Sequence, residues 1–288
     1  SDCLVGSEMC IRDSNNCKIQ LIGFHGQTIV HKPKDGYSIQ MGDANLLSQE
    51  LKEKVIYNFR ANDIKNNGEG APLTPVYHKL LINKFKINNP TLILNIGGIS
   101  NYTYFFNDTL AAKDIGPGNV LMDEYLKKTK GIDYDKNGDI ASSGNINKDI
   151  INQFYEHEFY NVQQKHSFDR NEFDFSFVKG LEFEDAVATL TYFTALIISQ
   201  NIKKNFDNEI EIILCGGGRR NLALVNHIKK LLKYKIKLID EFSVDGDFIE
   251  SQAFAYLSIR SYLNKIISYP STTNVLNPVT GGEIKINF

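Results

Sequence analysis

Apolar and polar residues are distributed along the chain in a way that predicts short strands alternating with amphipathic helices. Strands are expected where short apolar runs end in turn residues, at 18–24, 37–40, 55–59, 91–94, 102–106, 209–214 and 235–238. Helices are expected where apolar residues recur every three to four positions, at 45–53, 75–83, 120–128, 150–158, 183–204, 221–233 and 249–264. Because strands alternate with helices and glycines follow several strands, the pattern predicts an α/β fold with mixed layers.

Three local features refine this outline. Residues 91–106 predict a hairpin that turns at Gly97 and Gly98. Asn45 is a suitable N-cap for the first predicted helix. Residues 133–147 are polar and rich in turn residues, and 114–119 contain Gly-Pro-Gly, so loops are expected in both places.

The composition limits the classes of protein to be considered. At 288 residues, the chain is long enough to bury substantial cores and is expected to form two domains. Its 32 basic and 34 acidic side chains give a formal net charge of −2 without a long basic run, so nucleic acid is not an expected partner. A membrane is not expected either, because the best apolar candidate, 186–198, is interrupted by threonines and a tyrosine.

The cysteines and histidines lack the spacing of a metal site, so no metal site built from protein ligands is expected. Cys215 lies in an apolar strand and is predicted to be a small core residue, and cysteine use as a whole suits a reducing, cytoplasmic compartment. Residues 1–14 have no usable periodicity and lack the pattern of a secretory signal. They are predicted to be a non-native, disordered tail. Besides Cys215, the chain has three cysteines near its N-terminus: Cys3, Cys10 and Cys17.

Polar residues follow the first three predicted strands. They are His25 and Gln27, then Asp43, then Arg60 and Asp63. If these strands share a sheet, their ends could meet at one edge, where paired donors and acceptors would suit a sugar and a cation would suit a carboxylate. Taken one at a time, His25 could instead cap a turn, and Arg60 could pair with Asp63 on the surface.

Asp114 stands beside a glycine-rich segment, Gly116-Pro117-Gly118-Asn119, which precedes a predicted helix. An acid there would lie among free backbone N–H groups, a setting suited to phosphate and sugar chemistry. A carboxylate could take a proton from water or from a sugar hydroxyl during phosphoryl transfer. The alternative is an ordinary helix cap followed by a turn.

A third glycine segment, Gly216-Gly217-Gly218, follows a buried strand and precedes a helix. Its glycines would let the backbone approach a base or ribose, although the segment matches neither a Walker loop nor a dinucleotide fingerprint. A tight strand-to-helix turn explains it equally well. Glu250 lies at the start of the last predicted helix, where the helix dipole favours an acid whether or not it binds a ligand.

The order of these segments resembles one enzyme family. The motifs are His-Gly-Gln-Thr (25–28), Gly-Asp (42–43), Phe-Arg-x-x-Asp (59–63), Gly-x-Gly-Ala-Pro-Leu-x-Pro-x-x-His (68–78), Leu-Asn-Ile-Gly-Gly-Ile-x-Asn (94–101), Asp-x-Gly-Pro-Gly-Asn-x-Leu-Met-Asp (114–123) and Cys-Gly-Gly-Gly-x-x-Asn (215–221). Together they resemble the anhydro-N-acetylmuramic acid kinases of bacterial cell-wall recycling. Seven co-linear motifs between about 21 and 276 make the resemblance specific.

The resemblance implies a two-domain, actin-like fold of the sugar-kinase/Hsp70 type with an interdomain cleft. The N-terminal domain would be 15–110, with the sugar-binding loops, and the C-terminal domain 111–288, with the catalytic Asp and the adenosine-binding glycines. The family uses ATP with Mg²⁺ to phosphorylate O6 of 1,6-anhydro-N-acetylmuramic acid while water opens the anhydro bridge. The implied partners are this amino sugar and ATP, and a homodimer is compatible with the sequence.

The resemblance also implies a role for each residue singled out above. Asp114 would be the general base that activates water. The sugar pocket would be lined by His25, Gln27, Asp43, Arg60, Asp63 and Glu250. The nucleotide would be bordered by Asn95, Gly97, Gly98, Gly116, Gly118, Gly216, Gly217 and Gly218.

The chain departs from the family pattern in one respect. The family begins with a strand and a Gly-Thr-Ser-x-Asp-Gly loop that contacts the ATP phosphates, and this sequence contains no such loop. The chain is therefore expected to lack its first hairpin and to be inactive, or nearly so, by itself. A catalytically silent, actin-like module that binds a sugar or a nucleotide is the alternative. An acyl or carbamoyl transferase or an Hsp70-like ATPase on the same fold would lack the His-Gly-Gln-Thr and Phe-Arg-x-x-Asp motifs.

Overall fold

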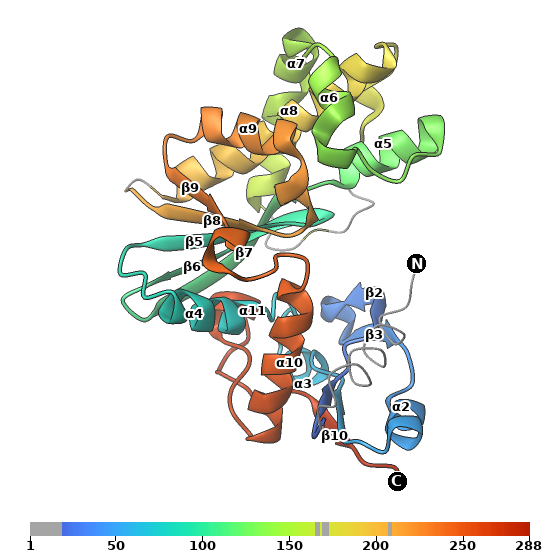
Figure 1. Ribbon diagram of the computed structural model, residues 1–288, viewed down its shortest axis with the longest axis vertical. Helices are drawn as coiled ribbons and strands as arrows, with labels where there is room; N and C mark the ends of the chain where they lie inside the picture. The colour runs from blue at the N-terminus through green and yellow to red at the C-terminus, as the bar shows by residue number, and fades with distance from the viewer. Residues whose placement is uncertain (1–18, 165–167, 169–172, 207–208) are drawn as a thin grey trace. The chain divides into compact units, whose positions relative to one another are not determined.

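The computed structural model describes residues 19–164, 168, 173–206 and 209–288, and Figure 1 shows its helices and strands. The chain forms two compact units: Ser1–Tyr77 with Ser251–Phe288, and His78–Glu250. The divisions fall inside α4 (Pro75–Lys84) and α10 (Ile249–Tyr262), so each of these helices carries the chain from one unit to the other. The tail predicted at 1–14 and the three N-terminal cysteines lie outside the described residues.

A five-stranded sheet in the order β7-β6-β5-β8-β9 forms the centre of the second unit. The strands are β5 (Thr91–Ile96), β6 (Ile99–Phe106), β7 (Thr109–Pro117), β8 (Glu211–Cys215) and β9 (Lys235–Leu238). β5, β8 and β9 are parallel, whereas β6 runs antiparallel to both β5 and β7. Because β5 and β7 lie in the same sheet as β8, the two units do not separate at the expected boundary of 110/111.

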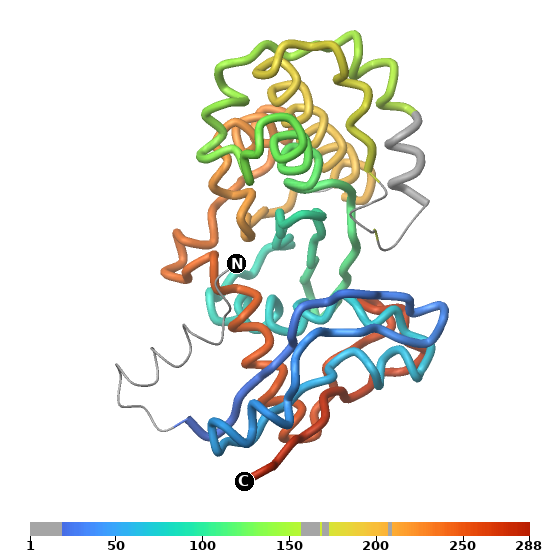
Figure 2. The backbone as a smooth tube through the Cα atoms, turned by 90° about the vertical axis from the view of Figure 1, so that its right-hand side faces the viewer, coloured from blue at the N-terminus to red at the C-terminus, as the bar shows by residue number. Residues whose placement is uncertain are grey.

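Helices cover one side of this sheet, as both views show (Figures 1 and 2). They are α5 (Val120–Lys130), α6 (Asp139–Ser143), α7 (Lys148–Gln164), α8 (Phe183–Asn205) and α9 (Leu222–Leu231). Leu190 of α8, Leu94 of β5 and Ile228 of α9 belong to one buried apolar cluster. Cys215, at the end of β8, is fully buried, as its apolar surroundings in the sequence predict.

The first unit contains a smaller sheet in the order β1-β4-β10, in which β1 is parallel and β10 antiparallel to β4. These strands are β1 (Ile22–Gly23), β4 (Val55–Tyr57) and β10 (Glu283–Lys285). A separate hairpin pairs β2 (Gln27–Lys32) with β3 (Tyr37–Met41), joined through the 3₁₀ turn η1 (Pro33–Asp35). Helices α2 (Ala44–Leu51), α3 (Ala61–Lys65) and α11 (Pro270–Thr273) complete the unit. Its core packs Phe59 against Phe254 and Leu257 of α10.

The predicted α/β class is confirmed, and most expected elements are present with small shifts at their ends. The expected strand at 18–24 is shorter, Ile22–Gly23, α6 forms within the loop expected at 133–147, and β2 forms where no element was predicted. The N-cap of α2 is Asp43 rather than Asn45, because Asp43 Oδ1 accepts the N–H groups of Asn45 at 2.8 Å and Leu46 at 3.1 Å. Among the described residues, no helix has both the length and the apolar character needed to cross a membrane.

Candidate functional site

Three glycine-containing segments meet at one edge of the five-stranded sheet. Gly97 and Gly98 follow β5, Gly118 follows β7, and Gly216–Gly218 follow β8. β5 and β8 are parallel, and β7 has the same direction as β5 because both are antiparallel to β6. Their carboxyl ends therefore lie at the same edge. We call this group of residues, Gly97, Gly98, Gly118 and Gly216–Gly218, the glycine edge.

Backbone hydrogen bonds join the first two segments of the glycine edge. The Gly98 carbonyl accepts the N–H groups of Gly118 at 2.8 Å and Val120 at 3.2 Å, and the Gly97 carbonyl accepts that of Asn119 at 2.8 Å. A Cβ on Gly118 would lie 2.1 Å from the Gly97 oxygen, so only glycine permits this approach. The N–H groups of Asn119 and Val120 at the start of α5, and that of Gly118 before it, are therefore not free, because they bind the neighbouring turn.

The third segment of the glycine edge is packed on two sides and open on another. Gly216 has φ +79°, and a Cβ there would lie 2.4 Å from Asn95 Oδ1. A Cβ on Gly218 would lie 2.3 Å from Cγ2 of Ile96. At Gly217, by contrast, the nearest heavy atom to such a Cβ is 3.8 Å away. The segment thus has an open side at Gly217, whereas Gly216 and Gly218 pack against β5.

Asp114 lies on β7 beside a β-bulge. The β6–β7 ladder pairs Asn101 with Asp114, and the next pair involves Gly116, which leaves Ile115 as an extra residue. Asp114 is half-buried, and its Oδ2 accepts the N–H group of Phe168 at 3.2 Å. The expectation that Asp114 lies on a loop is wrong, since it is a strand residue. Bulges redirect side chains, and this one lies directly before the glycine edge.

In the first unit, His25 and Arg60 contact each other after the ends of two parallel strands, β1 and β4. Arg60 Nε donates a hydrogen bond to His25 Nε2 at 3.0 Å, and His25 Nδ1 lies 2.7 Å from the Gly26 carbonyl oxygen. Because a guanidinium group has no acceptor, Nε2 is unprotonated and Nδ1 carries the hydrogen. Burial, helped by the charge of Arg60, lowers the pKa of His25 to about 4, so the imidazole is neutral at pH 7.

Asp63 is almost completely buried and is hydrogen-bonded to the loop at 68–70 and to Thr273. It is 1% exposed, its Oδ1 accepts the Gly70 N–H group at 2.6 Å, and its Oδ2 accepts the Thr273 hydroxyl at 2.5 Å. A Cβ on Gly68 would lie 2.1 Å from Oδ1. Arg60 holds the same loop, since its Nη1 donates to the Gly70 carbonyl at 2.8 Å. Asp63 therefore acts in the structure as a support for the loop that Arg60 contacts.

The remaining predicted sugar residues are all exposed. Gln27 begins β2 opposite Met41, and Asp43 caps α2. Glu250 belongs to the second unit and lies in the first turn of α10, at the start of a helix as predicted from the sequence.

Sequence reasoning gave no role to Arg219, which is 3% exposed and lies behind the third glycine segment. Its neighbour Arg220 has a side chain that is 64% exposed. The two arginines are chemically identical and adjacent, so no signal in the sequence distinguishes the buried one from the exposed one.

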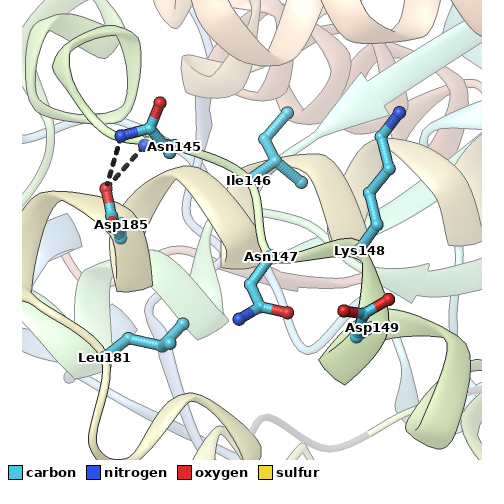
Figure 3. A pocket seen from close by; sticks show the side chains of 7 residues that line it. All are labelled: Asn145, Ile146, Asn147, Lys148, Asp149, Leu181 and Asp185. Carbon is cyan, nitrogen blue, oxygen red and sulfur yellow. Dashed lines mark hydrogen bonds between the residues drawn. The ribbon is translucent and has the colours of Figure 1, made fainter.

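A hollow of about 340 Å³ lies elsewhere in the second unit, beside the start of α7 and the start of α8 (Figure 3). At this hollow, Asp185 points towards Asn145, and its Oδ1 accepts the Asn145 N–H group at 2.6 Å. The hollow is lined by Asn145, Ile146, Asn147, Lys148, Asp149, Leu181 and Asp185. None of the residues predicted to bind substrate or nucleotide contributes to this lining.

A profile of one protein family, anhydro-N-acetylmuramic acid kinase, matches residues 3–286 of the chain. The chain belongs to the anhydro-N-acetylmuramic acid kinase family. The resemblance seen in the seven motifs is thus confirmed, and so is the prediction of an enzyme of this kinase class. The matched range begins at residue 3, inside the segment 1–14 that was predicted to be a non-native tail.

Individual relatives agree with the family match. The chain is 50% identical over 281 residues to the anhydro-N-acetylmuramic acid kinase of Pelagibacter ubique (strain HTCC1062), covering 94% of this chain and 75% of the relative. It is 40% identical over 271 residues to that of Zymomonas mobilis subsp. mobilis, covering 93% and 74%. Among solved structures, it is similar to (R)-2-hydroxyglutaryl-CoA dehydratase component A of Acidaminococcus fermentans, with 10% identity, 81% and 79% coverage and a TM-score of 0.45.

Proposed function

We propose that this protein phosphorylates O6 of 1,6-anhydro-N-acetylmuramic acid with ATP while water opens the anhydro bridge. In this reaction the water oxygen bonds to C1 as the bond from C1 to O6 breaks. O6 then bonds to the γ-phosphorus as the bond to the ADP oxygen breaks. The products are N-acetylmuramic acid 6-phosphate, ADP and the proton taken from water. The observation that carries the proposal is the family match over residues 3–286, joined to the position of Asp114 next to the glycine edge.

Asp114 is the residue we propose as the general base. A general base must lie within hydrogen-bond reach of the proton that it takes, and an ionised carboxylate can accept that proton directly. The bulge at Ile115 gives Asp114 a direction that a regular strand would not, which supports a specific role. The half-buried carboxylate already accepts one backbone N–H group, from Phe168, and this bond would hold it in place.

The glycine edge is the part of the chain that we propose for the nucleotide, which would supply the phosphoryl group. The fit is supported by the open side at Gly217 and by the space at Gly97, where a Cβ would meet nothing closer than 3.5 Å. Gly216–Gly218 would contact the adenosine. Asn95, Gly97 and Gly98 would lie near the phosphates together with Gly116 and Gly118, which fix the turn. Such close approach of backbone to ligand is a common use of glycine.

Mg²⁺ is proposed to accompany ATP, but we assign it no protein ligand. Among the described residues, no three side chains of His, Cys, Asp or Glu are grouped so that they could hold a metal ion. Mg²⁺ in phosphoryl-transfer enzymes is commonly bound by one or two carboxylates and by the substrate phosphates, so such a group is not required.

For the sugar we propose His25, Gln27, Asp43, Arg60 and Glu250 as contacts, with Asp63 in support. Arg60 would suit the carboxylate of the muramic acid lactyl group, because guanidinium groups bind carboxylates well. We further propose that the family fold is actin-like, with sugar-binding and nucleotide-binding domains, and that the protein works in the cytosol, where ATP is available and thiols stay reduced.

Replacing Asp114 with Asn tests the proposal in a chain to which the family's Gly-Thr-Ser-x-Asp-Gly loop has been added, because the chain without that loop is expected to be inactive or nearly so. Asparagine keeps the shape and an acceptor for the Phe168 N–H group but cannot take a proton, so sugar-dependent ADP release should fall by about 10²- to 10⁴-fold. Binding of 1,6-anhydro-N-acetylmuramic acid, measured by calorimetry, should stay close to that of the parent chain. Asp108→Asn is the matched control, because Asp108 is an exposed acid on the turn between β6 and β7.

Two results would count against this function. Full turnover by the Asp114→Asn variant would show that Asp114 is not the base. ADP release that does not depend on the sugar would point to a different acceptor. Product analysis by phosphorus NMR separates these cases, because a sugar 6-phosphate and inorganic phosphate give different signals.

A further inference from the structure

Arg219 is a buried cation directly behind the third glycine segment. It lies in the 3₁₀ turn η5 (Gly217–Arg220), between β8 and α9, and is 3% exposed. Burial of a charge is costly unless hydrogen-bonded partners compensate for lost water. The partners of Arg219 therefore indicate what this residue does.

Four hydrogen bonds hold the Arg219 guanidinium group. Nε and Nη2 donate to the two carboxylate oxygens of Asp240 at 2.7 and 3.0 Å, and Asp240 belongs to the 3₁₀ turn η6 (Ile239–Phe242) after β9. Nη1 donates to Asp247 Oδ1 at 2.8 Å and to the Gly216 carbonyl at 3.1 Å. A Cβ on Gly246 would lie 2.3 Å from Nε, so the loop before α10 closes tightly over the guanidinium group.

These contacts leave Arg219 little capacity to bind a phosphate itself. A guanidinium group has five N–H donors, and four of the hydrogen bonds that they can make already go to protein oxygens. The hydrogen bond with Asp240 raises the pKa of Arg219, and the same bond lowers the pKa of Asp240, so both groups stay charged. The cation is thus neutralised by carboxylates and directed at the backbone of the glycine edge.

The Gly216 carbonyl is the group through which Arg219 reaches the glycine edge. Gly216 is held on one side by Asn95, against which no Cβ would fit, and on the other by the charged hydrogen bond from Arg219. Charge-assisted hydrogen bonds are stronger and more directional than neutral ones. The conformation of Gly216–Gly218 is therefore fixed by side chains from three parts of the second unit: β5, η6 and the loop at 245–247.

We propose that Arg219 is a positioning residue for the nucleotide: clamped by Asp240 and Asp247, it holds the Gly216 carbonyl so that Gly217 and Gly218 keep the shape that binds adenosine. This inference rests on the proposed role of the glycine edge. It gives Arg219, Asp240 and Asp247 a role beyond the proposed reaction itself.

The test compares Arg219→Lys with Arg220→Lys in the 288-residue chain. Lysine keeps the charge but has no planar fork, so it cannot bridge Asp240, Asp247 and Gly216 together. ADP binding, measured by calorimetry, should weaken about tenfold in Arg219→Lys, equivalent to about 1.4 kcal/mol. The matched control, Arg220→Lys, should stay within about twofold, because its side chain is 64% exposed and lysine keeps the charge that pairs with Asp247 Oδ2. Affinity for 1,6-anhydro-N-acetylmuramic acid should not change in either variant.

Hydrogen exchange without nucleotide gives a second, independent measurement. The Asn221 amide donates to the Gly218 carbonyl at 3.1 Å, and its exchange should accelerate in Arg219→Lys but not in Arg220→Lys. If Arg219→Lys does not fold, Asp240→Asn is measured in the same two ways, and the same directions are expected.

Unchanged ADP affinity together with unchanged exchange at Asn221 would overturn the role of Arg219 alone. A parent chain that binds the sugar but not ADP would overturn the nucleotide role of the whole glycine edge, and that of Arg219 with it. Faster exchange and weaker ADP binding, both confined to Arg219→Lys, would support the inference.

Discussion

The two groups of candidate residues differ in what fixes their geometry. In the first unit, the His25–Arg60 pair is made of side chains, and its arrangement depends on protonation, because Arg60 donates to an unprotonated His25 nitrogen. In the second unit, the glycine edge is made of backbone, and its arrangement depends on the absence of side chains. A Cβ on Gly118, for example, would lie 2.1 Å from a carbonyl oxygen.

This difference suits the ligands proposed for each. A sugar with a carboxylate needs a few directed polar groups, and those groups can be tuned by charge and burial. A nucleotide needs close approach to the main chain, which a glycine-lined surface provides. The geometry of the His25–Arg60 pair should therefore respond to pH, and that of the glycine edge should respond to small increases in side-chain volume.

The largest effect on stability is expected from Gly118→Ala. The added Cβ would clash with the Gly97 carbonyl, and no flexible side chain can move to relieve the contact. We expect a loss of about 3 kcal/mol or more in the free energy of unfolding, at the upper end for overpacking. Urea unfolding followed by circular dichroism measures this loss.

Gly217→Ala is the matched control for that substitution. The nearest atom to its Cβ is 3.8 Å away, so the free energy of unfolding should change by only about 0.5 kcal/mol or less. Its ADP affinity should nevertheless fall, because the methyl group would occupy the open side. Equal stability of the two variants would contradict the tight packing described for Gly118.

The next effect is a loss of stability at mildly acidic pH. His78 is fully buried, its Nδ1 lies 2.7 Å from Thr103 Oγ1, and burial lowers its pKa to about 4. The unfolded chain binds a proton near pH 6.5 and the folded chain does not, so the stabilisation present above pH 6.5 is lost as the pH falls towards 4. By pH 5 the loss should be on the order of 2 kcal/mol from this residue.

His78→Gln should flatten this pH dependence, and unfolding midpoints between pH 7.5 and 4.5 measure it. The dependence that remains reports on His25, whose pKa is also lowered to about 4 by burial and by the charge of Arg60, and on His227, whose pKa is lowered by burial and by the charge of Lys230. In that background, sugar affinity should stay constant above about pH 5 and weaken towards pH 4, as protonation removes the acceptor for Arg60. A His78→Gln curve as steep as that of the parent chain would contradict the assignment.

The smallest effect separates two roles of Asp43. Asp43→Ala should cost about 1 kcal/mol of stability, because it removes the N-cap of α2, whereas Asp43→Asn keeps a good cap. If the carboxylate also contacts the sugar, both variants should bind it more weakly. Sugar affinity unchanged in Asp43→Asn would limit Asp43 to capping.

The spacing of apolar residues predicted the helices and strands that pack against a buried core. β5, β9 and α8 appear close to their expected positions, because their apolar residues face a packed interior. β7 was expected to contain a loop, since its Asp, Lys and Gly residues carry no strand signal and it is held by pairing with β6. β2 has mostly exposed residues and pairs with β3 in a two-stranded sheet, so its sequence carries no pattern of alternating burial.

Contacts in the candidate site could be predicted only between residues that follow neighbouring strands. His25 and Arg60 were expected to meet because each follows a strand, and β1 and β4 are parallel neighbours. The burial of Asp63 and the Arg219 clamp depend on segments far away in sequence, such as Thr273 and Asp247. No local pattern reports such contacts.

The most direct test of the account maps each ligand on the amide resonances of the 288-residue chain. We expect ADP to shift the amides of Gly97, Gly98 and Gly216–Gly218. 1,6-Anhydro-N-acetylmuramic acid should instead shift those of residues 25–27 and Arg60. Resonances of the glycine edge that do not move when ADP is added, in a chain that binds ADP, would contradict the central claim that this edge holds the nucleotide.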